Sequence, residues 1–175
     1  MPLIYVTGIS GSGKSAVRDE LLKRGYEAHG TDEDGLAAFY DRATDKITER
    51  LNDPEQRTPE WRTKHVWKMS RDKVEELAKR TGSKPIFLCG VAENDGDMAD
   101  LFSKVVALVV DDKTLEHRIS TRTTGNFGKN PHELATILEW QKTAENDYKQ
   151  SGAVIVDATQ PISKVVNEIL DMINT

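Results

Sequence analysis

The sequence lacks several features that mark other classes of protein. It holds one cysteine, Cys89, which excludes an intrachain disulfide and any metal site built from clustered cysteines. No window approaches the ~20 consecutive apolar residues that a membrane-spanning helix needs. The chain does not begin with a basic segment and a cleavable apolar stretch, so we expect no secretory signal and a cytoplasmic setting.

An excess of basic residues is also missing. The chain has 24 Lys or Arg residues against 29 Asp or Glu residues, for a net charge of −5. Because nucleic acids are polyanions, this balance disfavours a general nucleic-acid-binding role. The 4 histidines share no metal-ligand spacing, so we assign them no metal and no catalytic role.

The remaining composition is that of one folded domain. Its 175 residues fit a single domain, and 37% hydrophobic with 30% charged residues argues against disorder. Short apolar runs alternate with longer helical patterns, which predicts a parallel sheet covered on both faces. The expected strands are residues 3–6, 27–30, 85–89, 105–110 and 153–156.

Three helices have recognisable ends. The first covers residues 14–24 and is closed by Gly25. The second starts with Asn130 as its N-cap and Glu133 at its third position, and runs to about residue 150. The third covers residues 161–173 and carries an apolar stripe that predicts packing on the sheet.

Two segments, residues 31–70 and 121–130, fit neither a strand nor a helix pattern. The first is long and polar, and the second contains two glycines without an apolar period. Long segments of this kind in a compact domain often form lids or binding loops.

Residues 8–15 read Gly-Ile-Ser-Gly-Ser-Gly-Lys-Ser and fit the phosphate-binding loop (P-loop) pattern GxxxxGK[ST]. The glycines let successive N–H groups point inward, and the N-terminus of the following helix adds positive partial charge. Lys14 would neutralise the β- and γ-phosphate oxygens, and the Ser15 hydroxyl would bind Mg²⁺. A glycine-rich turn without a ligand is the weaker reading, because strand, loop and helix occur together. The residues expected to bind ATP here are Gly8, Ser10, Gly11, Ser12, Gly13, Lys14, Ser15 and Ala16.

Other nucleotide-dependent classes are disfavoured. The sequence has no Asn-Lys-x-Asp motif for reading guanine, so we do not expect a GTPase. At 175 residues the chain is also short for most motor or AAA-type ATPases.

Arg118 and Arg122 lie four residues apart, so they leave the same face of a predicted helix. Two guanidinium groups on one face repel each other unless an anion or an aromatic ring lies against them. A guanidinium can stack on adenine and grip phosphate oxygens. An exposed basic face paired with Glu116 or Asp112 explains the same residues equally well, so the segment alone leaves both readings open.

A resemblance to the adenylate kinase family appears at this point. Residues 115–122 read Leu-Glu-His-Arg-Ile-Ser-Thr-Arg and resemble the Leu-x-x-Arg-x-x-x-Arg helix that enters that family's lid. Residues 157–162, Asp-Ala-Thr-Gln-Pro-Ile, resemble its Asp-Gly-Thr-x-Pro-Val turn, and residues 138–144 resemble the helix after the lid. With the P-loop, the likeness spans residues 1–25 and 105–173.

The resemblance implies a three-layer α/β/α P-loop NTPase fold with a five-stranded parallel sheet. It also implies a mobile lid over about residues 118–131. By carry-over, Arg118 would stack on adenine and Arg122 would contact the transferring phosphate. The backbone at Gln160 would meet the adenine edge.

Acidic residues follow the second expected strand. Asp32 and Asp34 resemble the Asp-x-Asp that small-metabolite P-loop kinases, such as shikimate and gluconate kinases, carry at this place. In an extended segment residues two apart point the same way, so one carboxylate would hold a Mg²⁺-bound water while the other accepts a hydroxyl proton. A solvated acidic turn that caps the next helix is the alternative. The position near the carboxyl ends of the strands favours a ligand site.

A basic stretch over residues 57–71 contrasts with the acidic whole. Arg62 and Arg71 are the candidates for contact with the acceptor, so the acceptor-binding region is expected at about residues 31–71. Trp61 and Trp67 fit either anchors in the core or stacking faces for a nucleic acid, and the structural reading is favoured.

The chain departs from adenylate kinases after the third expected strand. Their Asp-Gly-x-Pro-Arg is replaced by Gly-Val-Ala-Glu-Asn at residues 90–94, and Thr136 and Asn146 stand near their arginines on the helix after the lid. These differences argue against a nucleoside monophosphate as the acceptor. Asn94 would either contact the acceptor or lie in a turn, and the turn is favoured.

These observations predict an ATP-dependent kinase that phosphorylates a hydroxyl of a small molecule. Lys14, Asp32 and Arg122 would be catalytic, and Ser15 with Asp32 would hold Mg²⁺. A nucleoside or nucleoside monophosphate kinase is the nearest alternative. A regulatory ATPase that binds nucleotide without phosphorylating an acceptor is the second.

Overall fold

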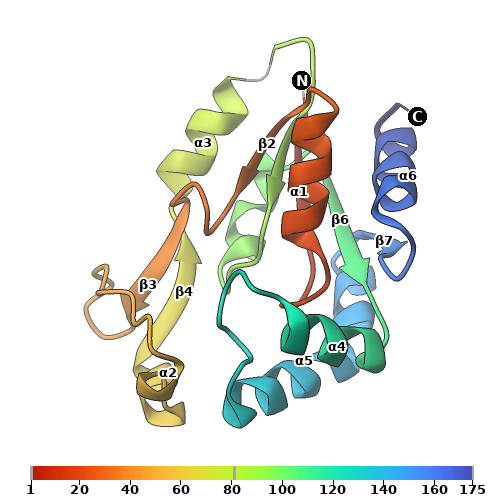
Figure 1. Ribbon diagram of the computed structural model, residues 1–175. Coiled ribbons are helices and arrows are strands. Elements are labelled where there is room, and N and C mark those ends of the chain that lie inside the picture. Colours follow the sequence, from red (N-terminus) through yellow and green to blue (C-terminus); the bar gives the residue numbers. More distant parts are fainter. Residues whose placement is uncertain (1, 81, 175) are drawn as a thin grey trace.

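The computed structural model describes residues 2–80 and 82–174, and its centre is a five-stranded parallel sheet (Figure 1). The strands are β1 (Leu3–Thr7), β2 (Glu27–Gly30), β5 (Ile86–Cys89), β6 (Lys104–Val109) and β7 (Val154–Asp157). Their order across the sheet is β2-β5-β1-β6-β7. All four pairings are parallel, which confirms the predicted sheet and its five strands.

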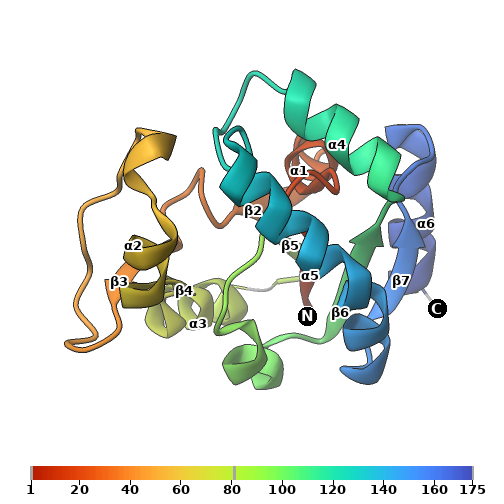
Figure 2. The ribbon, with the colours of Figure 1, turned by 90° about the horizontal axis from the view of Figure 1, so that it is seen from below.

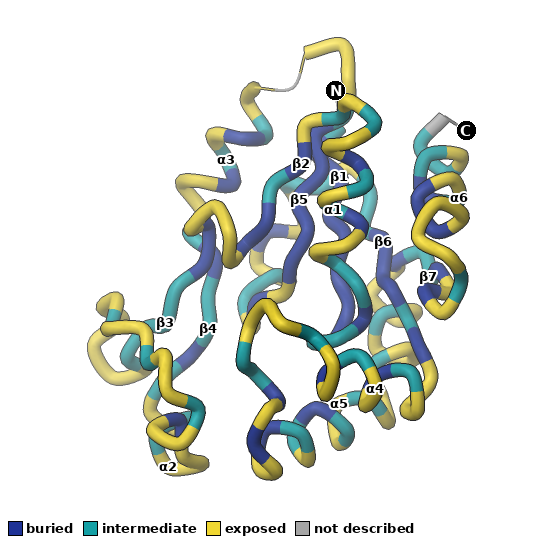
Figure 3. Tube along the Cα trace, viewed as in Figure 1, coloured by how far each residue is buried: buried dark blue, intermediate teal, exposed yellow. Residues whose placement is uncertain are grey.

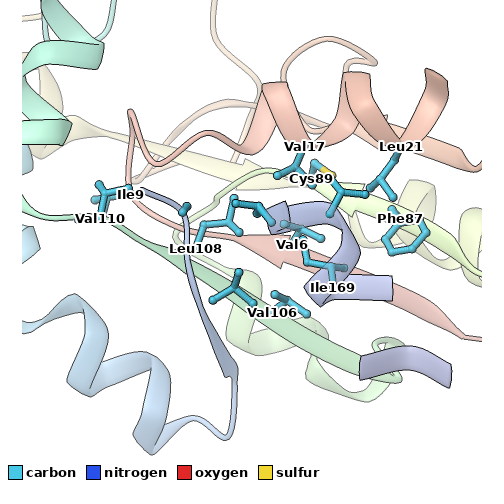
Figure 4. Close-up of a cluster of buried hydrophobic side chains, with 14 of the residues drawn as sticks. Val6, Ile9, Val17, Leu21, Phe87, Cys89, Val106, Leu108, Val110 and Ile169 are labelled. Atoms are coloured by element: carbon cyan, nitrogen blue, oxygen red, sulfur yellow. The ribbon is translucent and has the colours of Figure 1, made fainter. Parts of the chain in front are cut away.

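The two faces of β1 are buried in different clusters, as a central parallel strand requires. Ile4 and Val6 pack with residues of α1 (Lys14–Lys23) and α6 (Ile162–Asn174), whereas Leu3 and Tyr5 pack with residues of α3 (Arg71–Lys79). Figure 4 shows the first cluster between the sheet and α1, and Figure 3 shows burial concentrated along the strands. The α6 stripe predicted from the sequence therefore packs as expected.

Two further helices lie below the carboxyl ends of the parallel strands in Figure 1. They are α4 (Asp112–Thr121) and α5 (Pro131–Gln150), and the view from below in Figure 2 shows α5 crossing under the sheet. Asn130 caps α5 as predicted, because its side chain accepts a hydrogen bond of 2.8 Å from the backbone N–H of Glu133. A short 3₁₀ segment, η2 (Asp95–Leu101), precedes β6.

The unassigned segment 31–70 contains a β-hairpin-like unit that the sequence analysis did not predict. β3 (Ala37–Asp41) and β4 (His65–Met69) pair antiparallel, and η1 (Pro54–Gln56) and α2 (Pro59–Lys64) lie between them in the chain. Phe39 packs against the rings of Trp61 and Trp67, each with ring centroids 4.8 Å apart. Trp67 is also partly buried against the second core cluster, whereas Trp61 belongs to neither core cluster.

Within residues 2–80 and 82–174, the helices are all too short or too polar to span a bilayer.

Candidate active site

A cleft of about 920 Å³ lies at the carboxyl ends of the parallel strands. Its walls come from the P-loop, from residues 89–93 at the end of β5, from the β3–β4 unit, from the lid (residues 118–131) and from α5. Seven Lys or Arg residues and three Asp or Glu residues line it, so the cleft is basic although the protein is acidic. The basic residues are Lys14, Arg42, Arg50, Arg57, Arg62, Arg118 and Arg122, and the acidic ones are Asp32, Glu93 and Asp147.

The P-loop has the backbone conformation that its glycines predict. Gly11 and Gly13 have φ angles of 90° and 108°, in the region that side-chain-bearing residues rarely adopt. A Cβ atom on Gly8 would lie 2.7 Å from the carbonyl oxygen of Leu108 in the neighbouring strand, so this glycine is also required for close approach. The loop thus curls at the start of α1, where the helix N-terminus favours an anion.

Lys14 points back into this loop. Its Nζ donates hydrogen bonds to the carbonyl oxygens of Gly8 (2.6 Å) and Ile9 (2.8 Å). Burial in the cleft lowers the pKa of Lys14 to about 8, while Asp32 raises it and Arg122 lowers it further. The ammonium is therefore held by carbonyl dipoles in a place where a polyphosphate would stabilise its charge.

Ser15 has an acidic partner that we did not predict. Its hydroxyl donates a hydrogen bond of 2.9 Å to Glu33 Oε1, and the same carboxylate forms an ion pair of 2.8 Å with Arg18. Glu33 lies between Asp32 and Asp34, the two acids chosen by their spacing.

The structure separates Asp32 from Asp34. Asp32 lines the cleft, 3.7 Å from Arg50, and burial raises its pKa against the opposing effect of that guanidinium. Asp34 lies outside the lining residues and accepts a hydrogen bond of 2.7 Å from the backbone N–H of Gly30. The predicted acceptor contact of Asp34 is therefore corrected: it closes the turn after β2, and no helix follows that it could cap.

Arg118 links the P-loop to the turn after β7 through two hydrogen bonds. Its Nη1 donates to the carbonyl oxygen of Ser12 (3.0 Å), and its Nη2 donates to that of Ala158 (2.7 Å). The turn after β7 therefore lies beside the P-loop. Gln160 lies in the same turn, outside the residues that line the cleft, and its side chain donates to the carbonyl oxygen of Asp157 (3.1 Å).

Arg122 lies at the C-cap of α4 and lines the cleft with Lys14 and Asp32. Its Nη2 donates to the carbonyl oxygen of Phe127, and this hydrogen bond ties the lid to the end of α4. Burial lowers the pKa of the Arg122 guanidinium, while the carboxylates of Asp32 and Glu133 raise it. The proposed phosphate-contacting arginine is thus close enough to Asp32 for their charges to interact.

The two arginines expected to contact the acceptor have different positions. Arg62 lines the cleft and donates a hydrogen bond of 2.6 Å to Glu133. Arg71 lies outside the lining residues and pairs with Asp100 (2.5 Å) and Glu75 (3.0 Å). The prediction for Arg71 is corrected, because its guanidinium, at the start of α3, pairs with Glu75 of the same helix and with Asp100 of η2.

Further residues line the acceptor half of the cleft, and of these only Trp67 was considered from the sequence, as a stacking face. Phe39 and Trp67 supply aromatic surface there. Arg42 pairs with Glu93 at 2.8 Å and both line the cleft. Asn94 next to it makes two hydrogen bonds with the backbone of Met69, so the turn prediction for Asn94 is the better one. No local pattern in the sequence marks Phe39 and Arg42, because β3 and the residue after it reach the cleft through tertiary pairing with the chain around β4.

A resident metal site made by side chains alone is absent from the part of the chain that the structure describes, where no group of three His, Cys, Asp or Glu residues is suitably arranged. Mg²⁺ in phosphoryl-transfer sites is commonly held by one or two side chains together with phosphates and waters. The hydroxyl of Ser15 and the carboxylate of Asp32 are oxygen donors of that kind, so the residues present fit a nucleotide-bound Mg²⁺.

The fold and the cleft define a P-loop nucleotide-binding protein. Residues 4–139 match the family model of the AAA domain, so the chain belongs to that family. The short length, which we took to disfavour most AAA-type ATPases, is therefore compatible with this domain. A comparison with curated proteins found no match.

Several solved structures share this fold at low sequence identity. The shikimate kinase from Acinetobacter baumannii in complex with shikimate has a TM-score of 0.65 at 18% identity, covering 99% of this chain and 93% of that chain. The deoxyadenosine kinase from M. mycoides with bound dATP has a TM-score of 0.61 at 20% identity over 100% of both chains. A gluconokinase from Sinorhizobium meliloti 1021 reaches 0.52 at 20% identity, covering 95% of this chain and 88% of that chain. These likenesses confirm the predicted fold of small P-loop kinases.

Proposed function

We propose that this protein is an ATP-dependent phosphotransferase that moves the γ-phosphoryl group of ATP to a hydroxyl of a small molecule. The main observation in support of this proposal is that the P-loop, Asp32 and Arg122 line the same cleft. The P-loop seats the phosphates, and the cleft continues past them toward the β3–β4 unit, where an acceptor has room. The solved kinases of similar fold support this proposal as analogues.

The proposed chemistry is an in-line displacement. The acceptor oxygen forms a bond to the γ-phosphorus as the bond to the β–γ bridging oxygen breaks, and ADP leaves. Asp32 accepts the hydroxyl proton, and its raised pKa suits a general base. Lys14 and Arg122 stabilise the negative charge on the transferring group, where one arginine can be worth ~10³–10⁵ in rate.

Mg²⁺ would be held by Ser15 and Asp32 together with the phosphates, and it would supply positive charge that neutralises the β- and γ-oxygens. A hydroxyl that binds a metal through its oxygen still donates its proton, so Glu33 can keep its hydrogen bond with Ser15 and orient that ligand. ATP bound at the P-loop would meet Arg118 at the border with the turn after β7, where the resemblance to adenylate kinases puts adenine. The cytoplasmic setting expected from the composition stays a prediction.

A nucleoside kinase is the second candidate, and the acceptor half of the cleft favours it. Phe39 and Trp67 offer ring surface on which a base can stack. The Arg42–Glu93 pair beside them offers both donors and an acceptor at one edge. Against a monophosphate acceptor, Arg62 is already paired with Glu133 and Arg71 lies outside the cleft lining.

Formation of ADP, measured with a panel of acceptors, tests the proposal. Nucleosides, nucleoside monophosphates and hydroxy acids are each added with ATP and Mg²⁺, and one class is expected to stimulate turnover. Lys14→Met and Asp32→Asn should abolish that stimulation while the circular dichroism spectrum is retained. Asp34→Asn is the matched control, because Asp34 lies outside the cleft lining and should leave the acceptor's KM unchanged. Slow ATP hydrolysis that no acceptor stimulates would refute the kinase and favour the regulatory ATPase.

A further inference from the structure

Glu133, at the start of α5, is a buried carboxylate with an unusual number of donors. It is 1% exposed and accepts hydrogen bonds from Arg57 Nε (2.7 Å), Arg57 Nη2 (3.2 Å), Arg62 Nη2 (2.6 Å) and the backbone N–H of Gly128 (2.8 Å). Burial raises the pKa of Glu133, but these hydrogen bonds outweigh it and the net pKa is lowered. Its carboxylate therefore stays charged and is satisfied by cations from another segment of the chain.

Those cations come from the acceptor-binding region. Arg57 is 6% exposed, and besides Glu133 it donates to the carbonyl oxygen of Leu51 (2.8 Å) and to Asn126 Oδ1 (3.0 Å). Two asparagines of the lid extend the link: Asn126 donates to the carbonyl oxygen of Asn52, and Asn130 donates to that of Pro54 (3.0 Å). Side-chain hydrogen bonds thus join residues 51–57 to residues 126–133, which lie side by side in Figures 1 and 2.

Glu133 is linked to Arg122, a proposed catalytic residue, through the peptide group that joins Phe127 and Gly128. Gly128 donates to Glu133, and the preceding carbonyl group, that of Phe127, accepts from Arg122. The guanidinium of Arg62 lies 4.4 Å from the centroid of the Phe127 ring, on the cleft wall. The position of the lid backbone at Phe127 and Gly128 therefore depends on Glu133, and the orientation of Arg122 depends on that backbone.

We propose that Glu133 is a positioning residue that makes the lid and residues 51–57 of the acceptor-binding region open and close as one unit. When the carboxylate holds Arg57, Arg62 and Gly128, the two segments cover the cleft together and Arg122 faces the phosphate seat. Without the carboxylate, two cations face each other in a buried place, and both segments lose the contact that holds them closed. The role in catalysis rests on the proposed phosphotransferase function, whereas the coupling of the two segments does not.

Hydrogen–deuterium exchange tests the coupling without any substrate. Glu133→Gln is compared with Glu139→Gln, which makes the same chemical change on an exposed position of α5 that pairs with Lys142. Breaking one partner of a buried ion pair typically shifts a local equilibrium by about 100-fold or more. We expect peptides covering 51–57 and 123–129 to exchange faster together by that factor in Glu133→Gln, with β1 and β6 unchanged, and no effect in the control.

Other outcomes of the exchange experiment would overturn the proposal. It is wrong if only one of the two segments exchanges faster, if neither does, or if the sheet exchanges faster by the same factor. Should Glu133→Gln fail to fold, Arg57→Lys provides the answer, because it keeps the charge facing Glu133 but loses the guanidinium fork that also reaches Leu51 and Asn126. Both segments should then open together by about tenfold.

An activity measurement tests the role in catalysis separately. An open lid admits water, so Glu133→Gln should raise the ratio of ATP hydrolysis to acceptor phosphorylation and lower kcat more than it changes the affinity for ATP. An unchanged ratio together with faster exchange would refute the positioning of Arg122. If the wild-type protein has no acceptor-stimulated turnover, the phosphotransferase proposal fails, and the exchange result still decides whether Glu133 couples the two segments.

Discussion

The ammonium of Lys14 should couple nucleotide binding to proton uptake. Burial lowers its pKa to about 8 in the ligand-free protein, and a bound polyphosphate would raise it again because opposite charge favours the charged form. From this value about one-tenth of the molecules carry a neutral Lys14 at pH 7, and about nine-tenths do at pH 9. If ATP binds only to the charged form, its Kd should rise about tenfold between these two pH values.

Titration calorimetry measures both the affinity and the protons. MgATP is titrated at pH 7 and pH 9 in pairs of buffers that differ in ionisation enthalpy, so that the dependence of the observed heat on the buffer gives the protons taken up. We expect uptake of about 0.1 proton per ATP at pH 7 and about 0.9 at pH 9, from the pKa of about 8.

Lys14→Arg is the control for this linkage, because an arginine keeps its charge throughout this range. Its ATP affinity should change little between pH 7 and pH 9, and its binding should take up no proton. A wild-type Kd that is the same at both pH values, without proton uptake, would refute the reasoning. It would mean that Lys14 either keeps an ordinary pKa or does not meet the phosphates.

Three further predictions concern Asp32, Cys89 and Gly90. Asp32→Asn should lower the acceptor-stimulated kcat by about 10²–10⁴, because the amide cannot accept the hydroxyl proton. Cys89 is 3% exposed and burial raises its pKa to about 12, so a disulfide reagent at pH 8 should modify it only after denaturant is added. Gly90→Ala places a Cβ atom 2.1 Å from Thr31 Oγ1 and should cost roughly 1–3 kcal/mol in urea unfolding, whereas Gly82→Ala, with nothing within 4 Å, should not.

The parts of the fold that were predicted correctly have local signals. Four of the five parallel strands are short apolar runs, whereas β2 reads Glu-Ala-His-Gly, and α1 and α5 have end signals within a few residues of their boundaries. The β3–β4 unit has no such signal for its pairing, because Ala37 faces Met69 and Asp41 faces His65 across a long intervening segment. One signal there was readable and missed: Thr58 followed by Pro59 begins α2, and the Thr58 hydroxyl accepts from the backbone N–H of Trp61 at 3.1 Å.

The candidate site also contains residues that local sequence signals mark and residues that they do not. The P-loop was found because its glycines, lysine and serine are consecutive and the geometry follows from the backbone. Spacing alone failed for Asp32 and Asp34, because it assumed an extended segment. The chain turns at this point, where Asp34 bonds back to Gly30, and Glu33 then faces Ser15. A single turn therefore decides which of three consecutive acids reaches the cleft.

Glu133 illustrates why the remaining site residues were out of reach. The sequence marks it as the third residue of a capped helix, and its backbone N–H does bond to Asn130. Its carboxylate instead binds Arg57 and Arg62, more than seventy positions earlier in the chain. One residue thus serves the local helix start through its backbone and a distant contact through its side chain, and only the first is visible in a window of sequence. The contacts that would hold the cleft closed are all of this second kind, so tertiary structure was needed to find them.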